Sequence, residues 1–237
     1  VKRNTGGSSS GSGAAISANF AVLAIGTDTS TSVRGPSSYT GIVGLRPTTG
    51  LVSRTGIAPK NLNFDSAGPM ARNVTDLAHM LNVIATKDPA DPMNVTAWQG
   101  YERANPGAVD FTKSLNSTAI WGKKFGVLRD LFNGDPEINA LAEKALDAIR
   151  ALGGQTVDIK LDPEFVEFHL KSGVKRMREL SDYRFRVDWE QYLATFRNQN
   201  VPRTVEAFIK VYEDEVMKSP LPVEDSVMNL QIGRAHV

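Results

Sequence analysis

The clearest hydrophobic pattern in the chain lies between residues 125 and 161. Residues 125–128 form a short apolar run, and apolar side chains alternate with polar ones along 157–161, so we expect two β-strands. Between them, apolar residues recur at helical spacing: Ile138, Leu141, Ala142, Ala145, Leu146, Ile149 and Leu152. Asp135-Pro136 is typical of a helix start and Gly153-Gly154 of a helix end. Strand, crossover helix and strand together predict parallel pairing in an α/β sheet.

The first half of the chain has a weaker pattern. Residues 6–70 are rich in Gly, Ser, Thr and Pro with short apolar runs, which is typical of loops around a few buried strands. Within them, residues 14–24 are small, apolar and uncharged, and we expect one buried helix or strand there. A helix is predicted after Asn73, its expected cap, because Val74, Leu77, Leu81 and Ile84 recur at helical spacing.

Two segments are assigned from their composition. Residues 88–122 contain prolines, asparagines and scattered aromatic residues, and we interpret them as a long surface connection. Residues 163–217 are charged, aromatic and mostly helical in pattern, with breaks near Gly173 and at Val201-Pro202. We interpret the second segment as a peripheral helical layer or lid.

Composition narrows the class of protein. The 237 residues are 41% hydrophobic and 22% charged, as in ordinary globular chains, and the net charge of +1 gives no basic field for direct binding of nucleic acid. The chain has no apolar run near the roughly 18 residues that a membrane span needs. Because it has no cysteine, disulfides, thiol catalysis and cysteine-bound metal are excluded. A reducing compartment such as the cytoplasm fits this composition, and localisation and oligomeric state are otherwise open.

The domain organisation is predicted as follows. We expect residues 1–231 to be part of one domain, with 1–161 as its core and 162–217 as the peripheral helical layer. The chain begins at Val1 and reaches its richest motif within a few residues, so we expect an internal fragment of a longer protein. Residues 232–237 are expected to be a non-native tail.

That motif, residues 6–13, packs four serines and four glycines into eight positions. Its composition fits a flexible linker, but a second hydroxyl-rich segment at 26–38 favours two walls of one pocket. It also matches G-x-S-x-G, with Ser9 as a nucleophile. That interpretation is weak, because such an elbow needs a preceding strand and a histidine. The three histidines are more typical of structural positions or of the tail: His79, His169 and His236.

Of the other catalytic chemistries that we considered, one fits the sequence. The chain has no phosphate-loop, dinucleotide or metal-binding pattern, so no cofactor or metal is indicated. A serine activated by a neutral lysine needs no histidine, but it needs backbone N–H donors for the oxyanion. Residues 29–32 offer four consecutive N–H groups beside a serine hydroxyl.

Four sequence blocks carry a resemblance to a known family. They are GGSSSGSGAA, GTDTSTSVRGPSS, GIVGLRPTTGLVS and FDSAGPMARNVTDLA. In this order and spacing they resemble the amidase signature family, closely over about residues 4–85 and more loosely to about 161. The resemblance implies an α/β amidase-signature fold, with a mixed central sheet flanked by helices and present here in part. It also implies hydrolysis or transfer of amides by a Ser–cis-Ser–Lys triad without metal or cofactor, on a small-molecule amide substrate.

The resemblance implies roles for individual residues. Ser32 matches the acylated nucleophile and Ser8 the bridging serine, preceded by a cis peptide bond; they lie 24 positions apart (32 minus 8), as in the family. The N–H groups of Thr29, Ser30, Thr31 and Ser32 match the oxyanion hole. Asp28 and Arg34 match positions that we interpret as structural braces of this loop.

The chain departs from the family pattern in two places. Ser30-Thr31 replaces a common Gly-Gly, which narrows the approach of substrate. The general-base lysine is not in this chain: Lys2 lies only six positions before Ser8 and lacks that lysine's surrounding pattern. We therefore expect an amidase whose fragment is inactive alone. The alternatives are the amide-transferring subunit of a glutamyl-tRNA(Gln) amidotransferase, which needs partner subunits, and a non-catalytic family member.

Overall fold

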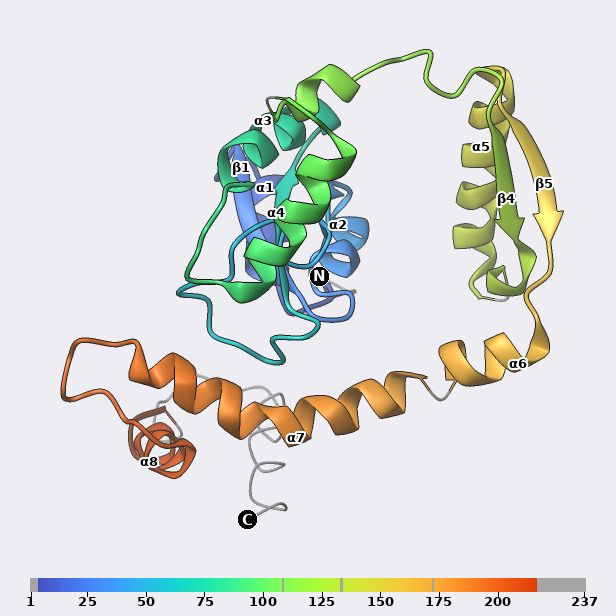
Figure 1. Ribbon diagram of the computed structural model, residues 1–237. Helices are drawn as coiled ribbons and strands as arrows, with labels where there is room; N and C mark the ends of the chain where they lie inside the picture. Colours follow the sequence, from blue (N-terminus) through green and yellow to red (C-terminus); the bar gives the residue numbers. More distant parts are fainter. Residues whose placement is uncertain (1–3, 108, 133, 172, 217–237) are drawn as a thin grey trace. The chain divides into compact units, whose positions relative to one another are not determined.

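The computed structural model describes residues 4–107, 109–132, 134–171 and 173–216 (Figure 1). The tail predicted at 232–237 lies outside these residues. The described chain divides into two compact units. The first comprises residues 4–107, 109–112 and 179–216, and the second comprises the described residues between 113 and 178. The expected single domain stays a prediction.

The first unit is built on a three-stranded antiparallel sheet. Its order is β1 (Leu23–Asp28), β3 (Ser66–Ala71) and β2 (Val43–Gly44), so β1 has a free edge within this sheet. All six residues of the central strand β3 are buried. Helices α1 (Ser10–Ser17) and α2 (Arg34–Thr40) flank β1 in the sequence. The first hydroxyl-rich segment continues into α1, and the second joins the end of β1 to α2.

The prediction of a single buried element at residues 14–24 is wrong. Helix α1 ends at Ser17 and β1 begins at Leu23, with an exposed turn between them. Asn19 lies in this turn at φ 62°, a left-handed conformation that asparagine tolerates and that ends a helix. Phe20 in the same turn is 86% exposed, so the apolar character of the segment does not reflect continuous burial.

The helix predicted after Asn73 is confirmed. Helix α3 spans Val74–Ile84, and the Asn73 side chain accepts a hydrogen bond from the backbone N–H of Asp76 at 2.8 Å. Leu77 and Leu81 are buried on one face of the helix. The capping signal is therefore correct, and the periodicity is correct for Leu77 and Leu81 but not for Val74, which is 56% exposed.

The interpretation of residues 88–122 as a long surface connection is wrong. It contains helix α4 (Pro92–Ala104) and a 3-10 turn, η1 (Phe111–Ser114). The Asp91 side chain caps α4 by accepting from the Met93 N–H at 3.1 Å, and the proline follows at the first turn. Trp98 on α4 is buried, and its indole N–H donates to the Leu51 carbonyl at 3.1 Å.

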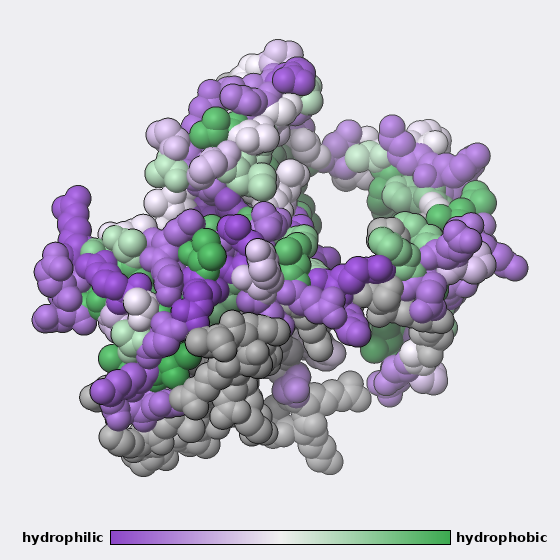
Figure 2. All heavy atoms as spheres, turned by 60° about the horizontal axis from the view of Figure 1, so that its bottom comes forward, coloured by the Kyte–Doolittle hydropathy of each residue, from purple (hydrophilic) through white to green (hydrophobic). Residues whose placement is uncertain are grey.

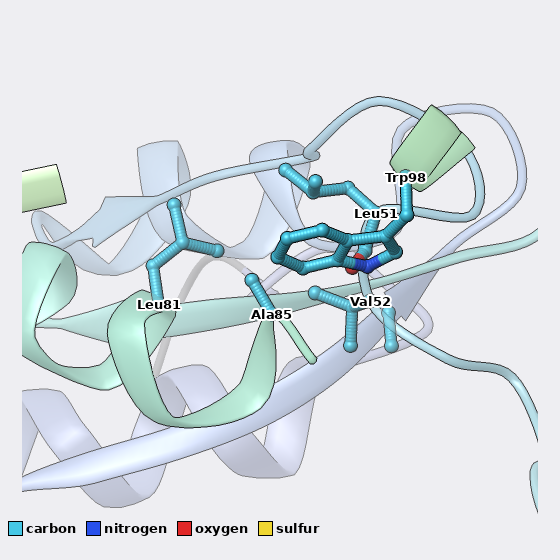
Figure 3. Close-up of a cluster of buried hydrophobic side chains, with 6 residues drawn as sticks. Leu51, Val52, Leu81, Ala85 and Trp98 are labelled. Carbon is cyan, nitrogen blue, oxygen red and sulfur yellow. The ribbon is translucent and has the colours of Figure 1, made fainter. Parts of the chain in front are cut away.

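The main hydrophobic core of the first unit surrounds this tryptophan. Figure 3 shows its indole ring lying against Leu51 and Val52, with Leu81 and Ala85 of the α3 region nearby. Ala67 of β3 belongs to the same cluster. Helices α3 and α4 are thereby joined to the sheet that carries the hydroxyl-rich loops.

The second unit contains the predicted strand–helix–strand pattern. Strand β4 (Lys124–Leu128) continues into the 3-10 turn η2 (Arg129–Leu131), and then come helix α5 (Pro136–Ala151) and strand β5 (Gln155–Ile159). The two strands pair in parallel, with Lys124 opposite Gln155, so the prediction is confirmed. No residue of α5 is buried within the described part of the chain, and Ile138 and Leu141 of its apolar stripe are 65% and 63% exposed. Figure 2 shows hydrophobic residues, in green, at the surface among hydrophilic ones.

The C-terminal part of the described chain is helical, as expected. It contains α6 (Pro163–Phe165), the π-helical turn η3 (Val166–Lys171), α7 (Gly173–Ala194), α8 (Val205–Val211) and a second π-helical turn, η4 (Tyr212–Val216). Helix α7 begins at Gly173, and Val201-Pro202 lie between α7 and α8, so both predicted breaks are confirmed. Trp189 of α7 packs on Phe208 of α8 with ring centroids 4.8 Å apart.

Candidate active site

The serine-rich loop is attached to the free edge of β1. The Ser9 hydroxyl accepts a hydrogen bond from the Thr27 N–H at 3.1 Å and lies 3.3 Å from the Thr27 carbonyl, to which it donates. The Ser12 hydroxyl donates to the Ile25 carbonyl at 3.0 Å. Hydroxyl groups thus take the place of a neighbouring strand. Because the Ser9 hydroxyl is used in this way, the structure gives Ser9 a structural role and does not favour it as an elbow nucleophile.

This attachment depends on a glycine in β1. A Cβ at Gly26 would lie 2.6 Å from the Ser9 hydroxyl oxygen and 2.8 Å from a methyl carbon of Val33. Such distances are far inside van der Waals contact, so only glycine permits the loop to lie this close to the strand.

The two hydroxyl-rich segments are neighbours in the structure. The Ser9 N–H donates to the Ser32 carbonyl at 3.1 Å. The peptide bond between Gly7 and Ser8 is cis, at the position where the resemblance implies one. Ser8 is exposed and Ser32 is half-buried. Within the described residues, neither side-chain hydroxyl is engaged in a hydrogen bond with another protein group.

Asp28 holds the end of the loop that carries Ser32. This carboxylate is fully buried and accepts from the N–H groups of Val33 and Arg34, at 3.1 and 3.3 Å. The Arg34 guanidinium adds two hydrogen bonds, at 3.0 and 3.2 Å. Burial by itself would raise the pKa of Asp28, but these donors outweigh it and hold the pKa below its ordinary value. The same pairing raises the pKa of Arg34.

Arg46 braces the same aspartate, and the sequence analysis missed it. Its Nε donates to the Asp28 carbonyl at 3.2 Å and lies 3.6 Å from the carboxylate, while its Nη2 donates to the Phe64 carbonyl at 2.7 Å. The sequence feature that could have identified Arg46 is that it is the one charged residue in the block 41–52. An arginine in such surroundings indicates a buried anion or carbonyl partner.

The loop between these braces presents unused donors. In the part of the chain that the structure describes, none of the backbone N–H groups of residues 29–32 donates to a protein acceptor. Ser30 and Thr31 are exposed, and Thr29 is half-buried. The Ser30 carbonyl accepts from Arg34, and the Thr31 carbonyl accepts from the Gly35 N–H at 2.7 Å. Because the carbonyls of Ser30, Thr31 and Ser32 accept hydrogen bonds from other groups and the N–H groups are unused, the loop can bind an anion or a developing oxyanion.

Other candidate groups do not join this site in the described residues. His79 is exposed on α3, whereas the side chain of His169 and all of His236 lie outside what the structure describes. No lysine of the described part hydrogen-bonds to Ser8 or Ser32. No group of three or more His, Cys, Asp or Glu residues suited to a metal ion occurs there, and no described helix is long and apolar enough to cross a membrane.

Comparison with known proteins decides the family. A family model described as Amidase matches residues 1–215. The chain belongs to the amidase family. Solved structures agree with this: peptide amidase from Stenotrophomonas maltophilia superposes with a TM-score of 0.81 at 32% identity, covering 99% of this chain and 45% of that one. The expected family and its α/β amidase-signature fold are confirmed.

Amidotransferase subunits are also similar to this amidase-family chain. A glutamyl-tRNA(Gln) amidotransferase subunit of Acinetobacter baumannii (strain AYE) is 39% identical over 160 residues, which are 66% of this chain and 31% of that protein. The corresponding subunit from Thermotoga maritima superposes with a TM-score of 0.63 at 27% identity, covering 98% of this chain and 43% of that one. The chain therefore spans about a third of the curated relatives that it matches and under half of these solved chains.

Proposed function

We propose that this chain is part of an amidase that cleaves a small carboxylic amide through an acyl-enzyme on Ser32. The observation that carries this proposal is the hydrogen bond from the Ser9 N–H to the Ser32 carbonyl. It brings the Ser8 segment beside a loop whose four N–H groups are unused. Two serines and an oxyanion site, together with a neutral lysine as the base, are what acyl transfer without histidine requires.

The proposed reaction has two halves. The Ser32 oxygen attacks the amide carbonyl carbon while its proton moves to the Ser8 oxygen, and Ser8 passes its own proton to a neutral lysine. The N–H groups of residues 29–32 stabilise the resulting oxyanion. The C–N bond then breaks as the proton returns through Ser8 to the leaving nitrogen, which departs as ammonia or an amine. Water cleaves the Ser32 ester by the same proton path and releases the acid.

The lysine is proposed to come from a segment that precedes residue 1 in the intact protein. The family resemblance supports this position, since its lysine block lies upstream of the serine run. The chain by itself is then inactive. Adding the upstream segment is expected to restore turnover, and replacing its lysine with methionine is expected to remove that turnover again.

The test uses the intact protein encoded by the complete gene. Ser32→Ala is expected to lower kcat on a series of small amides by several orders of magnitude, because the acyl-enzyme cannot form. Ser38→Ala is the matched control, since Ser38 is an exposed serine on the nearby helix α2 and is expected to retain wild-type turnover. A fluorophosphonate probe followed by peptide mass mapping is expected to label Ser32. Near-wild-type turnover of Ser32→Ala would refute the proposal, and the absence of a lysine from the upstream part of the complete gene would favour a non-catalytic family member.

A second candidate is the amide-transferring subunit of a glutamyl-tRNA(Gln) amidotransferase. The 39% identity to such subunits over 160 residues favours it. The chemistry at Ser32 is unchanged, but glutamine is the amide and the released ammonia is used by partner subunits. Glutaminase activity that appears only with a copurifying partner supports this candidate. Turnover of small amides by the intact protein alone supports the hydrolase.

A further inference from the structure

We call residues 29–32 the oxyanion loop. Asp28 contacts the Val33 end of this loop, and Asp65 contacts its Thr29 end. The Thr29 hydroxyl donates to its carboxylate at 2.5 Å. Strand register explains the contact: Asp28 of β1 is paired with Ser66 of β3 in antiparallel orientation. The residue after Asp28 and the residue before Ser66 are therefore opposite one another. Asp65 was given no role in the site by the sequence analysis.

Both oxygens of the Asp65 carboxylate are occupied by protein donors. While one accepts from Thr29, the other accepts from the N–H groups of Lys60 and Asn61, at 2.8 and 2.9 Å. The side chain is 6% exposed. A buried carboxylate with three donors has one orientation, because any rotation would leave a buried donor unpaired.

The segment that holds Asp65 is itself anchored. The Asn61 carbonyl accepts from the Phe64 and Asp65 N–H groups, at 2.9 and 2.8 Å, which closes a tight turn. The fully buried Asn61 side chain donates to the Ser181 hydroxyl of α7 at 3.2 Å. The Leu62 N–H donates to the buried carboxylate of Asp188, also on α7, at 3.0 Å. These contacts hold Asp65 in place independently of the loop 29–32, so Asp65 can fix the position of Thr29.

We propose that Asp65 is a positioning residue, which acts through the Thr29 hydroxyl to fix the first N–H donor of the oxyanion loop. The proposal rests on the function proposed above. Asp28 fixes the Val33 and Arg34 end of this loop, and Asp65 fixes the Thr29 end. A donor held in place before the oxyanion forms needs no reorganisation during the reaction, which is the condition under which such donors are most effective.

The test removes the hydroxyl without changing the shape of the side chain. In the intact protein, Thr29→Val is expected to lower kcat on an amide substrate by about ten- to a hundredfold, somewhat less than loss of a whole oxyanion donor. KM is expected to stay within about threefold, since the donor acts on the transition state. Thr29→Ser is the matched control, because it keeps the hydroxyl, and it is expected to restore kcat to within about threefold of wild type.

A double-mutant cycle separates positioning from a structural effect. Asp65→Asn turns an NH₂ group toward one set of donors, so it breaks the arrangement on at least one side. If Asp65 acts through Thr29, the double variant Thr29→Val/Asp65→Asn is expected to lose about as much kcat as Asp65→Asn alone. Multiplication of the two single losses would overturn the proposal. Turnover is expressed per site labelled by a fluorophosphonate probe, so that unfolded protein does not count.

The outcomes for the two proposals are distinct. If Ser32→Ala abolishes turnover but Thr29→Val changes kcat per labelled site by less than twofold, Asp65 has no positioning role and the amidase proposal stands. If Ser32→Ala leaves turnover intact, both proposals fall. A loss of kcat in Thr29→Val that Thr29→Ser does not rescue also overturns the positioning role.

Discussion

Replacing Asp28 tests how the candidate site is held together. Its carboxylate accepts four hydrogen bonds from Val33 and Arg34, between 3.0 and 3.3 Å. Asp28→Asn removes the charge and points an NH₂ group at some of these donors. Breaking a buried ion pair costs about 3–5 kcal/mol, and we expect the lower end, because the half-exposed Arg34 side chain can return to water. The expected loss in the free energy of unfolding is therefore about 3 kcal/mol.

Urea unfolding of the intact protein measures this loss. Asp147→Asn is the matched control: its pair with Arg150 is shorter, at 2.6 Å against 3.0 Å for Asp28–Arg34, but the two side chains are 72% and 42% exposed. We expect the control to change stability by less than about 0.5 kcal/mol. A loss below about 1 kcal/mol for Asp28→Asn, or equal losses for both variants, would show that burial and hydrogen bonding do not give Asp28 its importance.

The same variant has a distinct pH dependence. The pKa of Asp28 in the folded chain lies below the ordinary value of 3.8, so its ionised form stabilises the fold. This contribution is complete above the ordinary pKa and is lost as the pH falls through the folded pKa. We therefore expect the stability difference between wild type and Asp28→Asn to be constant near neutral pH and to shrink below about pH 4. A difference that grows on acidification contradicts the assigned direction.

Two further predictions concern packing around the site. Gly26→Ala is expected to lower amidase activity at least tenfold, because its Cβ would lie 2.6 Å from the Ser9 hydroxyl oxygen, whereas Gly100→Ala on α4 meets no atom within 4 Å and is expected to retain activity. Trp98→Phe is expected to lower the free energy of unfolding by about 1–3 kcal/mol, because the buried Leu51 carbonyl loses its indole donor. Activity assays and urea unfolding check these two results, and wild-type behaviour in either variant contradicts the corresponding contact.

The sequence predicts elements whose signals are local. Asn73 and the apolar spacing after it predict the start of α3, and a helix between two apolar strands predicts the parallel pair β4–β5. The assignment of Asp28 as a brace comes from the family resemblance, and its partners Val33 and Arg34 also lie within six positions of it. The cap and the brace join groups within six positions of each other, and β4 and β5 are joined by a single helix, so a continuous stretch of sequence contains each interaction.

Helix α4 has a local start signal that the interpretation as a surface connection overlooked. Asp91-Pro92 has the form of Asp135-Pro136, which correctly predicts the start of α5. The segment lacks a continuous apolar stripe: the buried residues of α4 are Asn94 and Trp98, and Trp98 is the large apolar one. A capping signal followed by one buried aromatic residue predicts a helix less strongly than an apolar stripe does. In α4 it is sufficient, because the aromatic ring packs into the core around Leu51.

Asp65 shows what a sequence pattern does not contain. In the sequence it is a single aspartate next to a short apolar run, as Asp28 is, but its partner Thr29 lies 36 positions away. Only the register of β1 on β3 brings them together, and β3 is buried at all six positions, so its residues show no alternation from which a register can be predicted. A shift of one residue in this pairing would separate Asp65 from Thr29 and remove this contact from the Thr29 end of the loop 29–32. The geometry of the candidate site is therefore a consequence of strand register, and variants that disturb the β1–β3 pairing are expected to affect catalysis even where they touch neither serine.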